Sequence, residues 1–91
     1  MNLRDIFKQG DTFKGITCVQ TDFHQFNDVP SVWEVTAVYP NWLEARNTKK
    51  QVNTRYTCPE GRRASFSIGD LVHSGLIDPF YANPQAAVRR V

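Results

Sequence analysis

The clearest structural signal in this chain of 91 residues is VWEVTAVYPNWLEARN, residues 32–47. Apolar and polar side chains alternate through residues 32–40, which is the period of a strand with one buried face. Pro40 suits the second position of a tight turn, and residues 42–47 then alternate again. We therefore predict a β-hairpin whose second strand turns Leu43 and Ala45 inward. The first strand is predicted to carry four side chains on one face: Trp33, Val35, Ala37 and Tyr39.

The segment before this hairpin predicts one more strand and a loop. Residues 12–20, TFKGITCVQ, are rich in β-forming residues, and Gly15 interrupts their alternation. A glycine at such a position predicts a bulge or a tight bend in the strand. Residues 21–31 are mostly polar, so we predict an irregular loop whose Phe23 and Phe26 pack back onto the core.

The segment after the hairpin predicts two further strands. Residues 52–58, VNTRYTC, alternate as one strand, and residues 64–68, ASFSI, form the last one. Short strands joined by polar turns are typical of a β-meander. The predicted fold class is therefore mainly β (α+β), with a small bent antiparallel sheet or SH3-like barrel of about 4–5 strands.

Two short helices are predicted beside the strands. Asn2 can cap a short N-terminal helix, which Gly10 would end. Ser67 and Asp70 stand three residues apart, as in a capping box, which predicts a short helix near 68–74. The pair Gly69-Asp70 is then a structural hinge, because the further glycines or the Lys and Ser/Thr of a phosphate-binding turn do not follow it.

Length and composition indicate one domain of ordinary globular type. A chain of this length has room for a single core, so residues 1–91 are predicted to form one small β-rich domain, with 78–91 as a flexible C-terminal tail. The sequence contains no apolar run near the roughly 20 residues that span a bilayer, and no signal-peptide pattern. We therefore expect a cytoplasmic protein without a membrane partner. Cys18 and Cys58 are expected to be buried free thiols on strands.

Metal and catalytic chemistry find little support in the sequence. Cys18, His24, Cys58 and His73 lack the close pairs in which zinc ligands usually occur. A nucleophilic Cys would need a neighbouring His that a third group orients, and no motif here indicates one. We expect no metal, no cofactor, no catalytic residue and no enzymatic activity.

The basic half of the chain suggests one binding function. The formal net charge is +2, and most of the positive excess lies in residues 46–63. Basic loops beside aromatic rings are how small β-barrels hold nucleic acid, although charged residues also keep exposed strand edges from pairing. The candidate nucleic-acid-binding residues are Arg46, Lys49, Lys50, Arg55, Arg62, Arg63, Trp42 and Tyr56. Tyr56 shares one strand face with Val52 and Cys58, so the alternative is that Tyr56 is a core residue.

Protein recognition is the leading functional hypothesis. Small β-sheets often bind partners through an edge strand or an aromatic patch, and Trp is prominent in interface energetics. We predict a non-enzymatic small binding module, an accessory or inhibitor protein with a protein partner; nucleic-acid binding is the alternative. A homo-oligomer could form through an edge strand. The candidate protein-binding residues are Trp42, Asp22, Asp28 and Glu44.

Overall fold

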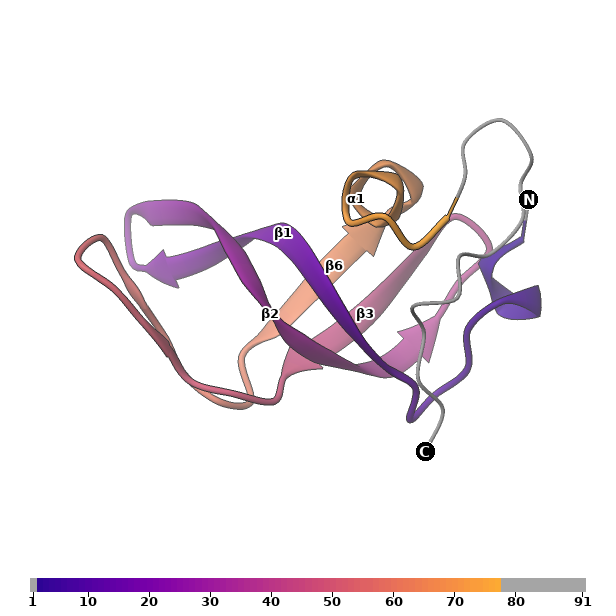
Figure 1. The fold of residues 1–91 in the computed structure, drawn as a ribbon, viewed down its shortest axis with the longest axis horizontal. Helices are drawn as coiled ribbons and strands as arrows, with labels where there is room; N and C mark the ends of the chain where they lie inside the picture. Colours follow the sequence, from indigo (N-terminus) through magenta and orange to yellow (C-terminus); the bar gives the residue numbers. More distant parts are fainter. Residues whose placement is uncertain (1, 78–91) are drawn as a thin grey trace.

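A curled antiparallel sheet forms the body of the protein (Figure 1). The computed structural model describes residues 2–77. The four strands of the sheet lie in the order β1-β2-β3-β6. Their bounds are Thr12–Asp22 for β1, Gln25–Val38 for β2, Trp42–Asn47 for β3 and Arg63–Ser67 for β6. The predicted mainly β fold is confirmed, in the form of a half-barrel.

Four smaller elements complete the described chain. A 3-10 helix, η1, spans Leu3–Asp5, and α1 spans Ile68–His73 after the last strand. Strands β4 (Gln51–Val52) and β5 (Thr57–Cys58) form a small second sheet. In the sequence, this pair lies between β3 and β6. The tail predicted for 78–91 lies outside the described residues.

Side chains bridge the gap between the two outer strands of the half-barrel. Helix α1 packs against both β1 and β6. The Ile16 amide donates to Ser74 Oγ at 3.0 Å, just beyond α1, and the Thr17 hydroxyl donates to the Ser65 carbonyl at 2.9 Å. This bridge, the seam, holds β1 to β6 through hydroxyl groups in place of a backbone ladder.

The capping of α1 agrees with its prediction. The Ser67 hydroxyl accepts from the Asp70 amide at 3.1 Å, and the Asp70 carboxylate accepts from the Ser67 amide at 2.9 Å. Gly75 has a φ of +77°, and the Leu76 amide donates to the Leu71 carbonyl at 2.9 Å. These bonds form the capping box expected from the sequence, and Gly75 ends the helix in the left-handed conformation.

Four aromatic rings fill the core under the sheet. Phe13 and Phe66 meet edge to face at 5.0 Å between ring centroids, and Trp33 lies 5.3 Å from Phe66. Phe7, from the segment after η1, contacts Phe13 at 6.0 Å. The β2–β3 hairpin is confirmed, and Leu43 and Ala45 are buried as predicted.

Gly15 allows two aromatic rings to pack closely on β1. The strand has no bulge at this residue, where one was predicted. Gly15 stays opposite Ser31 in the β1–β2 ladder, and the register shifts further along, between Gln20 and Asp22. A Cβ atom on Gly15 would lie 2.8 Å from the Phe13 ring and 3.1 Å from the Phe66 ring. The glycine therefore lets both rings approach the strand.

A bulge in β2 corrects the face predicted for residues 33–39. The β2–β3 register shifts between Val35 and Ala37, so Ala37 stands opposite Glu44 and Val38 stands opposite the buried Leu43. Trp33 and Val35 point inward as expected. The extra residue reverses the alternation beyond Val35, so Val38 packs on the core while Tyr39 is exposed.

The loop predicted for 21–31 is wrong, because most of this segment belongs to β2. A tight turn joins β1 to β2, which already begins at Gln25. Pro30 is tolerated because β3 ends opposite Trp33, so no neighbouring strand on that side requires its N–H. Phe23 and Phe26 do not pack onto the core either: they are 78% and 65% exposed.

Residues 52–58 form a hairpin and not the single strand that was predicted. The ladder pairs Gln51 with Cys58 and Val52 with Thr57. The Asn53 side chain reverses the chain, since its Oδ1 accepts from the amides of Arg55 at 2.8 Å and Tyr56 at 2.9 Å. Such a turn depends on one polar side chain, which alternation does not reveal.

Candidate functional site

Two hairpins project to the same side of the molecule, away from α1 (Figure 1). One is the end of the β1–β2 hairpin and the other is the β4–β5 hairpin. The Gln25 side chain donates to the Arg55 carbonyl at 2.9 Å, and the Gln51 side chain donates to Ser31 Oγ at 3.2 Å. These bonds hold the two hairpins side by side.

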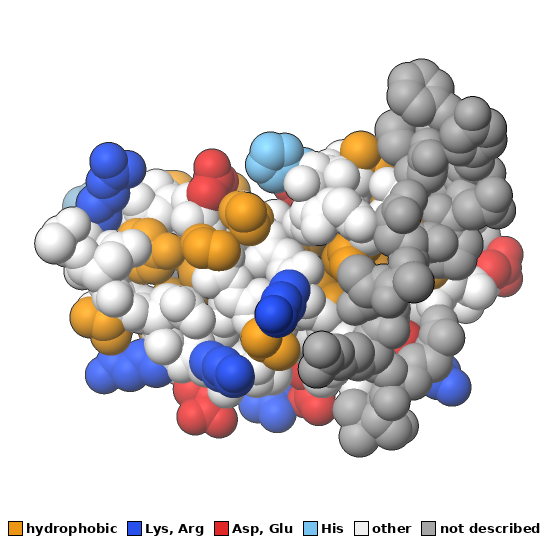
Figure 2. All heavy atoms as spheres, in the orientation of Figure 1, with side chains coloured by type: hydrophobic (Ala, Val, Ile, Leu, Met, Phe, Trp, Pro, Cys, Tyr) orange, Lys and Arg blue, Asp and Glu red, His pale blue; other side chains and the backbone are white. Residues whose placement is uncertain are grey.

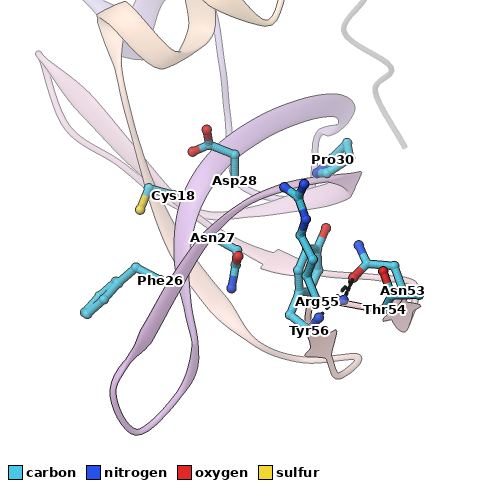
Figure 3. A pocket seen from close by; sticks show the side chains of 9 residues that line it. All are labelled: Cys18, Phe26, Asn27, Asp28, Pro30, Asn53, Thr54, Arg55 and Tyr56. Atoms are coloured by element: carbon cyan, nitrogen blue, oxygen red, sulfur yellow. Dashed lines mark hydrogen bonds between the residues drawn. The ribbon is translucent and has the colours of Figure 1, made fainter.

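An open groove of about 620 Å³ lies between the hairpins (Figure 3). The Phe26 side chain stands on one side of this groove, and Arg55 and Tyr56 stand on the other. Tyr56 is half-buried and packs on the edge of the core. The lining of the hairpin groove consists of Cys18, Phe26, Asn27, Asp28, Pro30, Asn53, Thr54, Arg55 and Tyr56.

Large apolar side chains are exposed on the two hairpins that form the groove. Phe23 and Phe26 belong to the β1–β2 hairpin, and Val52, on β4, is 66% exposed. Figure 2 shows hydrophobic side chains on the surface over the projecting hairpins. An apolar cluster of this kind, rimmed by polar residues, is typical of an interaction surface. The sequence signal was the pair of phenylalanines within the polar segment 21–31.

The candidate nucleic-acid-binding residues lie in separate places. Arg46 pairs with Glu34 at 2.7 Å, and Arg63 lies 3.6 Å from Glu44, so two of the cations face acidic neighbours on the outer side of the sheet. Arg55 lies at the hairpin groove. The remaining cations are Lys49, Lys50 and Arg62, in the turns at the end of β3 and before β6.

Asn47 brings these two turns together. Its backbone amide donates to the Arg62 carbonyl at 2.8 Å, and its carbonyl accepts from Gly61 at 2.7 Å. Its buried side chain accepts from the Lys49 amide at 3.2 Å and donates to the Pro59 carbonyl at 3.1 Å. Lys49, Lys50 and Arg62 therefore share one end of the half-barrel.

The aromatic candidates do not share one platform. Trp42 stacks on Tyr39 at 4.3 Å between centroids, in the turn from β2 to β3. This turn is at the opposite end of β3 from Lys49 and Lys50, whereas Tyr56 lines the hairpin groove. Rings and cations therefore do not alternate along one surface.

The candidate protein-binding residues fall into two groups. Asp22 and Asp28 belong to the β1–β2 hairpin, and Asp28 lines the groove. Glu44 faces outward from β3, where it accepts from the Thr36 hydroxyl at 3.0 Å, and Trp42 is near the β2–β3 turn. The hairpin groove thus gathers Asp28 with Arg55 and Tyr56, which the sequence had assigned to a different function.

The two thiols occupy different environments. Cys58 is buried, as predicted, but Cys18 is exposed on the outer face of β1. Burial raises the pKa of the Cys58 thiol, although a hydrogen bond from Asn47 and the charge of Arg62 act in the lowering direction. A protonated, buried thiol is a poor nucleophile.

Metal-binding and membrane-spanning features are missing from residues 2–77. No three His, Cys, Asp or Glu side chains of this part gather as metal ligands. Its helices are also too short to cross a bilayer. Comparisons with protein-family models, with curated proteins and with solved structures found no match to this chain.

Proposed function

We propose that this protein is a non-enzymatic binding module that contacts a protein partner through the hairpin groove. The observation that carries this proposal is the exposure of Phe23, Phe26 and Val52 on the two hairpins that form the groove, with Phe26 in its lining. A small domain gains stability by burying such side chains, so their exposure at one place favours a contact function. An accessory or inhibitory role would follow from that contact.

The construction of the hairpin groove supports recognition by a preformed surface. Asn53 fixes the loop that carries Arg55 and Tyr56, and Gln25 ties this loop to the neighbouring hairpin. Surfaces that are ordered before binding lose less conformational entropy on association. Tyr and Arg are also enriched among the residues that dominate interface energies.

Partner capture with matched surface variants tests the proposal. The tagged full-length chain, its Phe23→Ser/Phe26→Ser variant and its Trp42→Ser variant are used to capture proteins from lysate of the source cells. We expect a stoichiometric partner that the wild type and Trp42→Ser retain and the phenylalanine variant loses. Repeated capture without such a partner, or loss only with Trp42→Ser, would contradict the proposed surface.

Nucleic-acid binding is a second candidate function, favoured by the placement of Lys49, Lys50 and Arg62 at one end of the half-barrel. Phosphate contacts by these cations would make binding weaken steeply with salt. The test is titration of labelled single- and double-stranded DNA and RNA at low and moderate salt. Lys49→Ala/Arg62→Ala is expected to reduce binding, while Arg55→Ala serves as the control. An absence of binding at low salt eliminates this function.

A further inference from the structure

The hairpin groove and a side chain suited to fill a groove lie on the same face of the molecule. Phe26 lines the groove, yet 65% of its surface remains exposed, and its ring points away from Arg55 and Tyr56 (Figure 3). The ring therefore leaves room between the hairpins and is itself available to a neighbour. A surface that offers both a projection and a hollow can match a copy of itself.

Opposite charges flank this same surface. Asp28 comes from β2 and Arg55 comes from the β4–β5 loop, and both line the groove. No ion pair joins Asp28 to Arg55 within residues 2–77. Each charge thus remains available to a partner of the other sign.

We propose that a second copy of this chain occupies the hairpin groove, which gives a two-fold symmetric dimer; this inference rests on the proposed function and names the partner. Phe26 of each copy enters the groove of the other copy. Asp28 faces the partner's Arg55, and Arg55 faces the partner's Asp28. A two-fold axis makes these contacts twice, which is the rule for an isologous interface.

The free edge of β1 offers much less for self-association. The backbone amide and carbonyl of Ile16 are already hydrogen-bonded to Ser74 Oγ, and the Thr17 side chain donates to the Ser65 carbonyl on β6. Beyond them the register shifts between Gln20 and Asp22, and a bulge of this kind discourages the addition of another strand. The dimer is therefore assigned to the outer face at the hairpins, whereas pairing through an edge strand was the expectation from the sequence.

Charge reversal gives a sharp test of this dimer. The mass of the full-length chain is measured by sedimentation equilibrium across a wide range of concentration, and circular dichroism verifies that each variant is folded. We expect a monomer–dimer equilibrium whose dissociation constant rises at least tenfold in Phe26→Ser, Asp28→Arg and Arg55→Asp. The control Tyr39→Ser, at the β2–β3 turn, is expected to dimerise like the wild type.

Complementation identifies the ion pairs themselves. A mixture of Asp28→Arg and Arg55→Asp is expected to form a heterodimer, because every contact then joins opposite charges. The double variant Asp28→Arg/Arg55→Asp is expected to recover the homodimer for the same reason. A mixture and a double variant that both stay monomeric would overturn the inference, as would single reversals that leave dimerisation unchanged.

The outcome separates this inference from the proposed function. A wild-type chain that stays monomeric up to millimolar concentration shows that the occupant is not a second copy. The capture experiment, with a partner that depends on Phe23 and Phe26, would still support the groove as a surface for another protein. A dimer that grows into larger species would also overturn the symmetric arrangement, since an isologous interface closes after two copies.

Discussion

The two ends of the curled sheet use the same kinds of residue for opposite purposes. At the closed end, α1 and the segment after η1 pack on the sheet, and Phe13, Trp33 and Phe66 are buried. At the projecting end, Phe26 on β2 and Phe23 in the β1–β2 turn stay exposed. Aromatic residues therefore belong to the core only where another element covers them.

The difference also separates stability from binding. Contacts at the closed end order the chain, so changes there are expected to lower the free energy of unfolding. Changes at the projecting end are expected to leave that free energy nearly constant and to alter association. The following measurements test this separation.

The largest expected effect is on the aromatic core. We expect Phe66→Ala to lower the free energy of unfolding by about 3–5 kcal/mol, since the ring contacts Phe13 and Trp33 and its removal leaves a cavity. Denaturant unfolding followed by fluorescence measures the change. Phe26→Ala, at the projecting end, is the control and should stay within about 0.5 kcal/mol when both chains are measured as monomers. Equal losses in both variants would remove the distinction between the two ends.

Alanine substitution of two glycines, Gly15 and Gly69, is expected to change the stability of the protein in opposite directions. Gly15→Ala should destabilise the protein by about 1–3 kcal/mol, because the new methyl group meets two packed rings. Gly69→Ala, in the first turn of α1, places its Cβ 3.5 Å from Ser67 Oγ, which is ordinary contact. The better helix propensity of Ala should stabilise this variant by about 0.5 kcal/mol. A melting temperature of Gly15→Ala that does not fall would contradict this account of Gly15, whereas a fall in Gly69→Ala would contradict only the helix-propensity argument.

A smaller effect is expected at the start of α1. Ser67→Ala removes the hydroxyl that caps the Asp70 amide, and a loss of about 1 kcal/mol is expected. Ser65→Ala, two residues earlier, changes an exposed side chain and is the matched control, with a change below about 0.5 kcal/mol. If the two variants unfold at the same denaturant concentration, the cap does not contribute as described.

The smallest effect concerns the thiols. At concentrations where the chain is monomeric, a thiol reagent should modify Cys18 rapidly in the native protein and Cys58 only after unfolding. Because the native pKa of Cys58 is raised, the unfolded chain loses this proton first as pH rises. The free energy of unfolding should therefore fall slightly above the ordinary thiol pKa of about 8.5, and Cys58→Ala should remove this part of the slope. Rapid labelling of both thiols in the native state would contradict the buried position of Cys58.

Local signals in the sequence predicted the parts of the fold that local interactions determine. The β2–β3 hairpin follows from alternation around Pro40, and α1 follows from the pair Ser67 and Asp70. The start of β2 did not follow, because residues 25–31 are extended through pairing with β1 and not through their own alternation. The bulges depend in the same way on neighbouring strands.

The candidate site was harder to predict for a related reason. Whether Arg46 is free to bind a phosphate depends on Glu34, which lies opposite it only after the strands pair. Arg55 and Asp28 approach one groove only because the chain turns back at Asn53. The sequence named several residues that line this groove but could not group them.

The seam between β1 and β6 joins the two outer strands of the half-barrel without a backbone ladder. Side-chain contacts join the outer strands here, through the hydroxyl groups of Ser74 and Thr17 and the Phe13–Phe66 ring pair, so their separation would break no backbone pairing of the sheet. Deuterium should consequently replace the Ile16 amide proton sooner than the amide protons in the middle of β2.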